Sequence, residues 1–283
     1  MDRASAPGSD AYQMVPSLEL HRSRTMRNLI FAAASTVLAA SPFVSAEAYA
    51  VCTAESPKHT LALAELYTSE GCDSCPPADK WLSGLAARGL AADKVVPLSL
   101  HVDYWDYIGW KDAFAQPKFT ERQRELSRLG GSTFVYTPQV VVSGRDFRGW
   151  SSTAFDAQVR AVNAKPAAAD IKLALEAVDG GIKVIADAVS RAPGATQLYV
   201  ALTQSRIVSN VKAGENRGAT LKHDYVVREW IGPVPVSGGK AQLGRTVISP
   251  KGAPTNDLGV VALVQDVRTG EVLQALNLNA CKS

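Results

Sequence analysis

The chain has 283 residues, of which 46% are hydrophobic and 20% are charged, and its mean hydropathy is −0.02. This composition excludes a membrane bundle and a disordered tail, and it indicates a soluble globular chain long enough for one large or two ordinary domains. The formal net charge is only +3 and no run of five like charges occurs, so we expect no nucleic-acid partner and no polybasic membrane surface.

Residues 1–50 are interpreted as a leader and signal peptide. Met26-Arg27-Asn28 precedes an apolar run at 29–40, and the small-residue sites Val44-Ser45-Ala46 and Ala48-Tyr49-Ala50 follow it. This apolar run is shorter than the roughly 18 to 20 residues of a membrane-spanning helix, so we expect no permanent membrane span. The residues before Met26 are either a long charged prefix or the product of an upstream start, with Met26 as the initiator. We therefore expect a cleaved, periplasmic or secreted protein.

Residues 51–165 alternate short apolar runs with helical patterns, which predicts an α/β layer. The strand-like runs lie at 61–67, 95–102 and 140–142, and the helical patterns lie at 76–87 and 119–129. Pro76 and Pro77 fit the first turn of the first helix, where no backbone donor is required. The spacing of apolar residues from Ala78 to Leu85 places them on one face of the helix, so we expect the helix to pack against the rest of the protein through this face.

Residues 166–283 are predicted to form a small antiparallel β domain. Apolar and polar residues alternate at 171–177 and 182–188, as in half-buried strands, and Asp179-Gly180-Gly181 joins them as a hairpin turn. Further strand-like stretches lie at 198–202, 225–230, 260–264 and 272–278.

A Cys-x-x-Cys pair, Cys72-Asp73-Ser74-Cys75, lies between a predicted strand and the start of a predicted helix. This context favours redox chemistry. Cys72 is expected just ahead of the helix, where unpaired amides and the helix dipole stabilise a thiolate, and Cys75 is expected to be more shielded. Cys72 is therefore the candidate nucleophile and Cys75 the resolving thiol. Asp73 opposes thiolate formation, so we expect a weak oxidant.

Two other interpretations of the pair stay open. The first is a purely structural Cys72–Cys75 bridge. The second is half of a zinc site, but no second Cys-x-x-Cys and no closely spaced histidine pair completes four ligands. His59, His101 and His223 have no spacing typical of a catalytic triad or a metal cluster, and His101 is read as a core residue. We expect no metal site and no diffusible cofactor.

Three further features have competing interpretations. Aromatic residues between 104 and 114 form either a substrate lip or a local core. Glu65 is either a proton acceptor behind Cys75 or, as we favour, an exposed carboxylate at a strand edge. The charged segments 212–217 and 222–224 are either a binding site or, as we favour, part of an ordinary hairpin connection.

Cys52 and Cys281 lie at the two ends of the predicted mature chain. Chain termini are often close, and the other two cysteines have each other, so a structural Cys52–Cys281 disulfide is the simplest pairing in an oxidising compartment. Four cysteines allow three pairings, and the sequence does not select one of them.

Thr137-Pro138 precedes the strand-like run Gln139 to Val142, a position where proline is tolerated. Here the chain resembles the thioredoxin superfamily, in which a residue followed by a cis-proline faces the Cys-x-x-Cys motif. The segment Tyr67-Thr68 to Cys75 resembles the glutaredoxin form of that motif. This resemblance implies that Thr137 and Pro138 bind the backbone of an extended substrate.

A closer resemblance rests on three segments: Glu65 to Asp79, Gly214-Glu215-Asn216-Arg217-Gly218, and His223 to Arg228. They are similar to a family of secreted bacterial proteins known as domain of unknown function 1223. The resemblance implies a thioredoxin-like domain at 51–165, with a helical insertion at 103–133, followed by the β domain at 166–283.

The expected function is that of a periplasmic or secreted thiol–disulfide oxidoreductase. Its substrate would be a cysteine-containing envelope protein or a small disulfide, and electrons would travel through the Cys72/Cys75 couple itself. The alternative is a secreted binding module without enzymatic activity, whose Cys72–Cys75 disulfide is structural.

Overall fold

The computed structural model describes residues 51–281, so the predicted leader, its cleavage sites and Met26 lie outside the described residues. The α-helices in this part are α1 (Pro76–Ser83), α2 (Pro117–Leu129) and α3 (Thr153–Asn163). Short 3-10 turns lie at Ala86–Arg88, Asp106–Ile108 and Thr255–Asp257. Within residues 51–281, no helix has the length and apolar character needed to cross a membrane.

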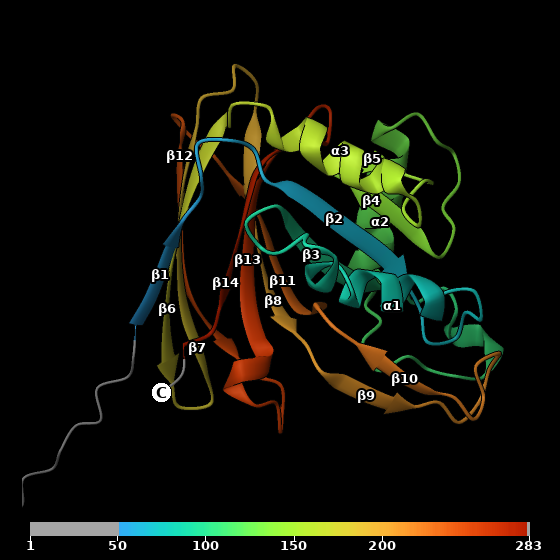
Figure 1. Cartoon of the computed structure of the whole chain (residues 1–283). Helices are drawn as coiled ribbons and strands as arrows, with labels where there is room; N and C mark the ends of the chain where they lie inside the picture. The colour runs from blue at the N-terminus through green and yellow to red at the C-terminus, as the bar shows by residue number, and fades with distance from the viewer. Residues whose placement is uncertain (1–50, 282–283) are drawn as a thin grey trace, which may run out of the picture. The chain divides into compact units, whose positions relative to one another are not determined.

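The strands of residues 51–281 form three sheets. An eight-stranded sheet has the order β14-β13-β8-β11-β3-β2-β4-β5, a four-stranded sheet has the order β1-β6-β7-β12, and β9 pairs with β10 (Figure 1). The strands up to β7 are β1 (Val51–Glu55), β2 (Ala62–Thr68), β3 (Val95–His101), β4 (Gln139–Val142), β5 (Arg145–Asp146), β6 (Ala169–Val178) and β7 (Gly181–Ser190). The later strands are β8 (Thr196–Gln204), β9 (Ile207–Asn210), β10 (Thr220–His223), β11 (Val226–Pro235), β12 (Lys240–Ile248), β13 (Leu258–Asp266) and β14 (Val272–Asn279).

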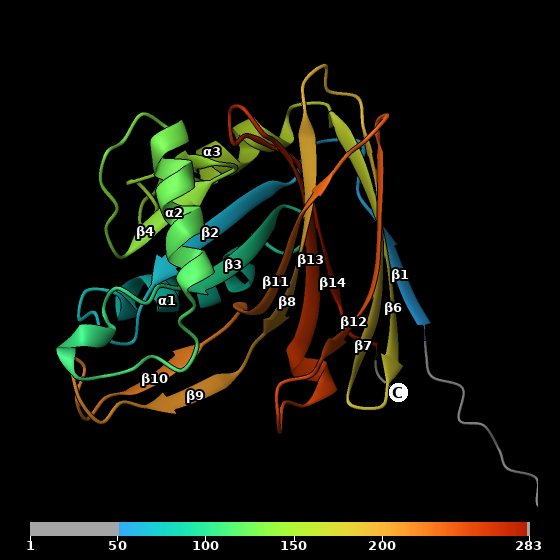
Figure 2. The same ribbon diagram turned by 180° about the vertical axis from the view of Figure 1, so that it is seen from behind.

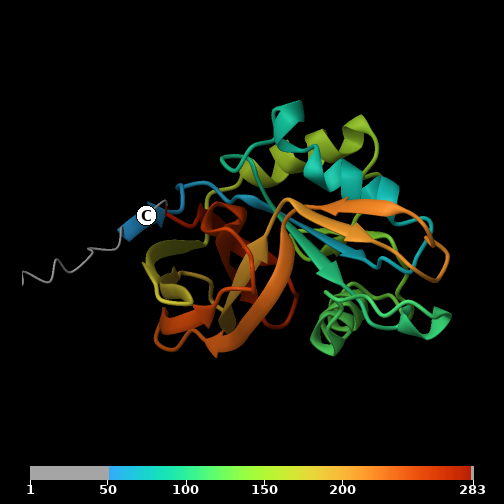
Figure 3. The ribbon, with the colours of Figure 1, turned by 90° about the horizontal axis from the view of Figure 1, so that it is seen from below.

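Helices cover both faces of the sheet around β2. One core packs α1 and α3 against β2 and β4, and another packs α2 against the opposite face of β2 and β3. Figure 3 shows α2 on the side of the sheet opposite α1 and α3. Every residue of β2 and β3 is therefore buried, and the two strands pair in parallel, which explains their nearly continuous apolar sequences.

The four-stranded sheet packs against β8, β13 and β14 as a sandwich (Figure 2). Inward-facing residues of β6 and β7 alternate with more exposed ones, as expected for strands with one solvated face. Val178 pairs with Gly181, so the turn between them is Asp179-Gly180, and Gly180 has a φ of +70° that favours glycine. The predicted hairpin is confirmed.

The expected domain boundary between residues 165 and 166 stays a prediction. Two of the sheets contain strands from both sides of this boundary. β11 pairs in parallel with β3, so strands from both sides share the eight-stranded sheet. β1 pairs antiparallel with β6 in the other sheet. The mixed α/β class predicted from the sequence is confirmed, whereas the β region is joined to the α/β layer through a continuous sheet.

The predicted pairing of Cys52 with Cys281 is present, and their Cα atoms lie 5.8 Å apart. Cys52 lies in β1, and Cys281 follows β14. The disulfide therefore joins the two ends of the described chain, next to the core of the sandwich.

Candidate functional site

The Cys-x-x-Cys pair lies in the turn between β2 and α1. Cys75 is the N-cap of α1, and its carbonyl accepts hydrogen bonds from the amides of Ala78 (2.9 Å) and Asp79 (3.1 Å). Cys72 and Cys75 form a disulfide with their Cα atoms 5.5 Å apart. The predicted position of the pair at a helix start is therefore confirmed.

We expected Cys75 to be more shielded than Cys72, but the two cysteines are equally buried. Both cysteines have 0% exposed surface, whereas Asp73 and Ser74 between them are exposed. Two segments distant in sequence pack against the turn that carries Cys72. We call these segments the cap: the β9–β10 connection at 211–219 and the segment 103–116.

Asn216 holds the first part of the cap on the motif. Its side-chain amide donates to the carbonyl oxygens of Cys72 (2.8 Å) and Glu70 (2.9 Å), and the carboxylate of Glu215 accepts from the Asp73 amide (3.1 Å). The segment is thus a hairpin connection, as favoured from the sequence, and it also covers the cysteine pair.

The second part of the cap packs through Ile108. Ile108 lies between Gly71 and Gly214, so a Cβ at either glycine would come within 3.3 Å of its Cδ1 atom. Gly214 also has a φ of +74°, which other residues rarely adopt. A larger side chain at either glycine would push the two parts of the cap apart.

Thr137 lies beside Cys72. The Thr137–Pro138 peptide bond is cis, and the Thr137 hydroxyl lies 3.5 Å from Cys72 Sγ. Trp105 Nε1 donates to the same hydroxyl oxygen at 2.6 Å. The structure therefore brings Thr137 and Cys72 together, and it adds Trp105, a residue of the aromatic segment that sequence reasoning did not assign to the site.

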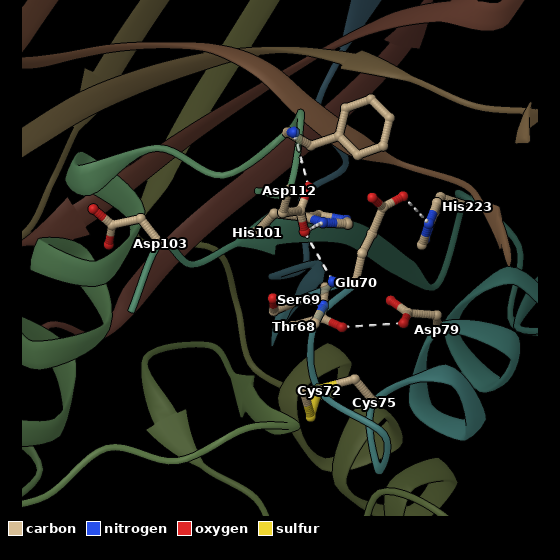
Figure 4. A network of polar contacts seen from close by, with 12 residues as sticks. Thr68, Ser69, Glu70, Cys72, Cys75, Asp79, His101, Asp103, Asp112 and His223 are labelled. Carbon is tan, nitrogen blue, oxygen red and sulfur yellow. Dashed lines mark hydrogen bonds and ion pairs between the residues drawn. A yellow bond between two sulfur atoms is a disulfide. The ribbon is translucent and has the colours of Figure 1, made fainter. Parts of the chain in front are cut away.

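A buried polar network lies beside the cysteine pair (Figure 4). His101 Nδ1 lies 2.7 Å from Asp112 Oδ2, and His223 Nε2 lies 3.1 Å from Glu70 Oε1. Asp79, in the first turn of α1, accepts a hydrogen bond from the Thr68 hydroxyl at 3.0 Å. Trp110 Nε1 donates to Glu70 Oε2 at 2.8 Å, and the amides of Glu70 and Phe114 donate to Asp112.

Burial and charge act in opposite directions in this network. Burial raises the pKa of Asp79, and the two imidazoles offset this effect only in part. Burial lowers the pKa of His101, but the Asp112 carboxylate reverses this effect, so the net pKa is raised. Burial also raises the pKa of Asp112, and His101 more than compensates, so the net pKa is lowered.

Two histidines and one carboxylate of the network converge. One ligand atom from each of Asp79, His101 and His223 lies within 4.8 Å of those from the other two. His101 Nε2 and His223 Nδ1 are buried and have no hydrogen-bond partner among the described residues. Sequence spacing could not have revealed this group, but both Asp79 and His223 belong to segments that carry the family resemblance.

A cavity of about 380 Å³ lies between α1 and β10. Asp79 and His223 line it, together with Pro76, Lys80, Ser83, Thr220, Leu221 and Lys222. The cavity gives the polar network contact with the surface.

Glu65 lies elsewhere, and our preferred interpretation of it as an exposed carboxylate is wrong. Its side chain is fully buried and ion-paired with Arg122 of α2, with 2.6 Å between Oε1 and Nε. Leu63 and Tyr67, two residues away on the same strand, pack in the core under α2, whereas Cys75 begins α1 on the opposite face. Glu65 therefore serves a buried ion pair and does not act behind Cys75.

Glu65→Gln is expected to lower the free energy of unfolding by about 3 kcal/mol, because it leaves the buried Arg122 guanidinium without its counter-charge. Denaturant unfolding monitored by circular dichroism measures the change. The matched control is Glu176→Gln, which breaks the exposed ion pair with Lys183 and should leave stability nearly unchanged. Equal effects of the two variants would contradict the structural role of the Glu65–Arg122 pair.

Comparisons with known proteins give one family and two solved structures. The profile of a family described as "Protein of unknown function (DUF1223)" matches residues 63–265. The crystal structure of protein AGR_C_4864 from Agrobacterium tumefaciens is similar, with 26% identity and a TM-score of 0.59; the match covers 80% of this chain and 97% of that one. A domain of the outer membrane lipoprotein Omp28 from Porphyromonas gingivalis matches at 16% identity and a TM-score of 0.25, over 40% of this chain and 88% of that one. No curated protein matches the chain.

Proposed function

The chain belongs to the DUF1223 family, and we propose that it is a thiol–disulfide oxidoreductase with a thioredoxin-like core, in which Cys72 exchanges disulfides with the substrate and Cys75 resolves them. The observation that carries the proposal is the Cys72–Cys75 disulfide at the start of α1, with the Thr137 hydroxyl 3.5 Å from Cys72 Sγ. Helix starts stabilise thiolates, so the position suits a reversible dithiol/disulfide couple.

The strand order around the site supports the thioredoxin-like core. β3, β2, β4 and β5 are neighbours in that order; β2 and β3 are parallel, and β4 and β5 are antiparallel to their neighbours. α1 connects β2 to β3, and Thr137-Pro138 immediately precedes β4. This arrangement places the Cys-x-x-Cys turn and the Thr137-Pro138 turn at the same end of the central strands.

The proposed exchange takes place in two steps. With the pair oxidised, a substrate thiolate attacks Cys72 Sγ, a mixed disulfide forms, and Cys75 leaves as a thiolate. The second thiolate of the substrate then attacks the substrate sulfur that is bonded to Cys72. The substrate disulfide forms, and Cys72 leaves as a thiolate. The substrate dithiol loses two electrons, the cysteine pair gains them, and the thiolates take up protons from solvent. The reverse sequence reduces a substrate disulfide.

In this proposal, the cap controls the access of the substrate to Cys72. Both cysteines are fully buried, and the β9–β10 connection is bonded to the Cys72 carbonyl oxygen, so we expect the substrate to reach Cys72 only after this connection moves away. Asn216 opposes this movement through its hydrogen bonds to Cys72 and Glu70. The same burial favours the competing function, a binding module with a structural disulfide, so access to Cys72 separates the two.

Asn216→Ala is expected to accelerate reduction of the Cys72–Cys75 disulfide by roughly 30-fold. It removes two hydrogen bonds of about 1 kcal/mol each from the closed cap, and a loss of about 2 kcal/mol corresponds to that factor. The rate is measured by adding dithiothreitol, quenching with an alkylating reagent and counting labelled cysteines by mass spectrometry.

The matched control is Asn210→Ala, at the end of β9, where an exposed asparagine side chain accepts a hydrogen bond from the Thr220 hydroxyl and does not contact the cysteine motif. It should leave the reduction rate unchanged. A pair that resists reduction equally in the wild type and both variants would contradict the oxidoreductase and favour the binding module.

The proposed compartment and substrates follow from the same chemistry. A long-range disulfide between Cys52 and Cys281 is typical of proteins from oxidising compartments, which supports a periplasmic or secreted location. There, a cysteine-containing envelope protein or a small disulfide is the substrate class that the couple would serve.

A further inference from the structure

We propose that Asp79, His101 and His223 bind a transition-metal ion beside the cysteine pair, and that Zn²⁺ is the ion that this donor set fits. The three residues come from α1, the end of β3 and the end of β10. Their ligand atoms lie within 4.8 Å of one another, and the three residues are 6%, 0% and 2% exposed. Two histidines and one carboxylate, with a further position open, form a recurrent zinc site.

The first argument is the orientation of the histidines. Each imidazole has one nitrogen held by a buried carboxylate, His101 by Asp112 and His223 by Glu70. A carboxylate that accepts the proton of one ring nitrogen leaves the lone pair of the other free, and this is the arrangement found around metal-bound histidines. Asp112 and Glu70 would thus orient the ligands without touching the ion.

The second argument is that the remaining nitrogens have no protein partner. His101 Nε2 and His223 Nδ1 are buried without a hydrogen bond among the described residues. Leaving a buried polar atom unsatisfied is costly, and such atoms are rare enough in folded proteins to need a specific explanation. Coordination of one ion would satisfy both.

The third argument is charge. Glu70, Asp79 and Asp112 are three buried carboxylates; Asp112 faces His101 and Glu70 faces His223, and in the described part of the chain none of the three forms an ion pair with a lysine or arginine. Buried charges are normally paired or coordinate metals. A divalent cation between His101, His223 and Asp79 would offset part of this negative charge.

The cavity between α1 and β10 supplies a route and room for a fourth ligand. Asp79 and His223 line this space of about 380 Å³, so an ion could enter from the surface and keep a water or a small ligand on its open side. Our expectation of no metal site rested on histidine spacing, and the ligands here are brought together by the fold.

The test is calorimetric titration of the untagged, chelator-treated full chain with Zn²⁺ alone, with both disulfides kept oxidised. We expect one ion per chain. His223→Gln is expected to weaken binding by 100-fold or more, Glu70→Gln by about 10- to 100-fold, and the exposed His59→Gln not at all. Binding that is absent in the wild type, or equally strong in His223→Gln, would overturn the proposal.

X-ray absorption of the zinc-loaded wild type decides the ligand set even if a variant fails to fold. Nitrogen and oxygen neighbours at about 2.0–2.1 Å, with no sulfur neighbour near 2.3 Å, support the site, and sulfur ligands overturn it. A Cys72→Ser/Cys75→Ser variant should still bind Zn²⁺, because the proposal uses no cysteine. Failure of the oxidoreductase and failure of the metal site are therefore distinguishable.

Discussion

Cys72→Ser is expected to abolish disulfide exchange, with a loss of turnover of about 1,000-fold or more. A serine hydroxyl is not ionised at neutral pH and cannot form the mixed disulfide, and we expect no residual route through Cys75, which is fully buried at the start of α1. Reduction of a disulfide-bonded peptide, with dithiothreitol as the electron donor, measures turnover. Cys75→Ser should instead accumulate a mixed disulfide on Cys72, visible as added mass.

The matched control is the double variant Cys52→Ser/Cys281→Ser, which removes the other disulfide and leaves the proposed exchange pair intact. It should retain turnover at a temperature where it stays folded. Turnover that survives in Cys72→Ser, or mixed disulfides formed through Cys75, would contradict the assignment of the attacking thiol.

Cys52→Ala/Cys281→Ala is expected to lower the free energy of unfolding by about 4–5 kcal/mol. The two residues are 229 positions apart, so the disulfide restricts a very long loop in the unfolded chain. It also fastens β1, which pairs only with β6 in its sheet, to the end of the chain. Denaturant unfolding under non-reducing conditions measures the loss.

The comparison is Cys72→Ala/Cys75→Ala, where the sequence separation is 3 and the chain-entropy effect is about 2 kcal/mol. The long-range disulfide should therefore contribute clearly more stability than the short one. An unchanged midpoint in Cys52→Ala/Cys281→Ala would mean that strand pairing alone holds the termini.

Local signals explain what the sequence could predict. Pro76 and Pro77 favour the first turn of α1, and alternation on both sides of Asp179-Gly180 predicts the β6–β7 hairpin. The position of the Cys72/Cys75 pair could be predicted in the same way. The two cysteines are three residues apart, and the strand before them and the helix after them lie in the same short segment. Each of these predictions depends on neighbours in sequence, which is why each holds.

Long-range contacts explain what could not be predicted. Asn216 is 144 residues from Cys72, and His223 is 153 residues from Glu70, so no spacing rule links them. The parallel pairing of β11 with β3, which shares one sheet between the two predicted domains, is equally remote in sequence. The burial of Cys72 and the converging histidines both follow from this nonlocal assembly.

The error at Glu65 has a different physical origin. A charged residue in a strand is expected to face solvent, and this expectation fails when helices cover both faces of the sheet. Arg122 of α2 then provides the partner that a buried carboxylate requires. His101, the buried polar residue at the end of β3, likewise has a buried partner, the carboxylate of Asp112.

The reduction potential of the Cys72/Cys75 couple tests the proposed function most directly. The protein is equilibrated in glutathione redox buffers, and each cysteine is then alkylated and quantified by mass spectrometry. We expect a potential between about −120 and −270 mV, the range from strong periplasmic oxidants to thioredoxin, with Cys72 alkylated before Cys75. A potential below about −300 mV, with both thiols inaccessible to the reagent, would mark a structural disulfide and contradict the oxidoreductase.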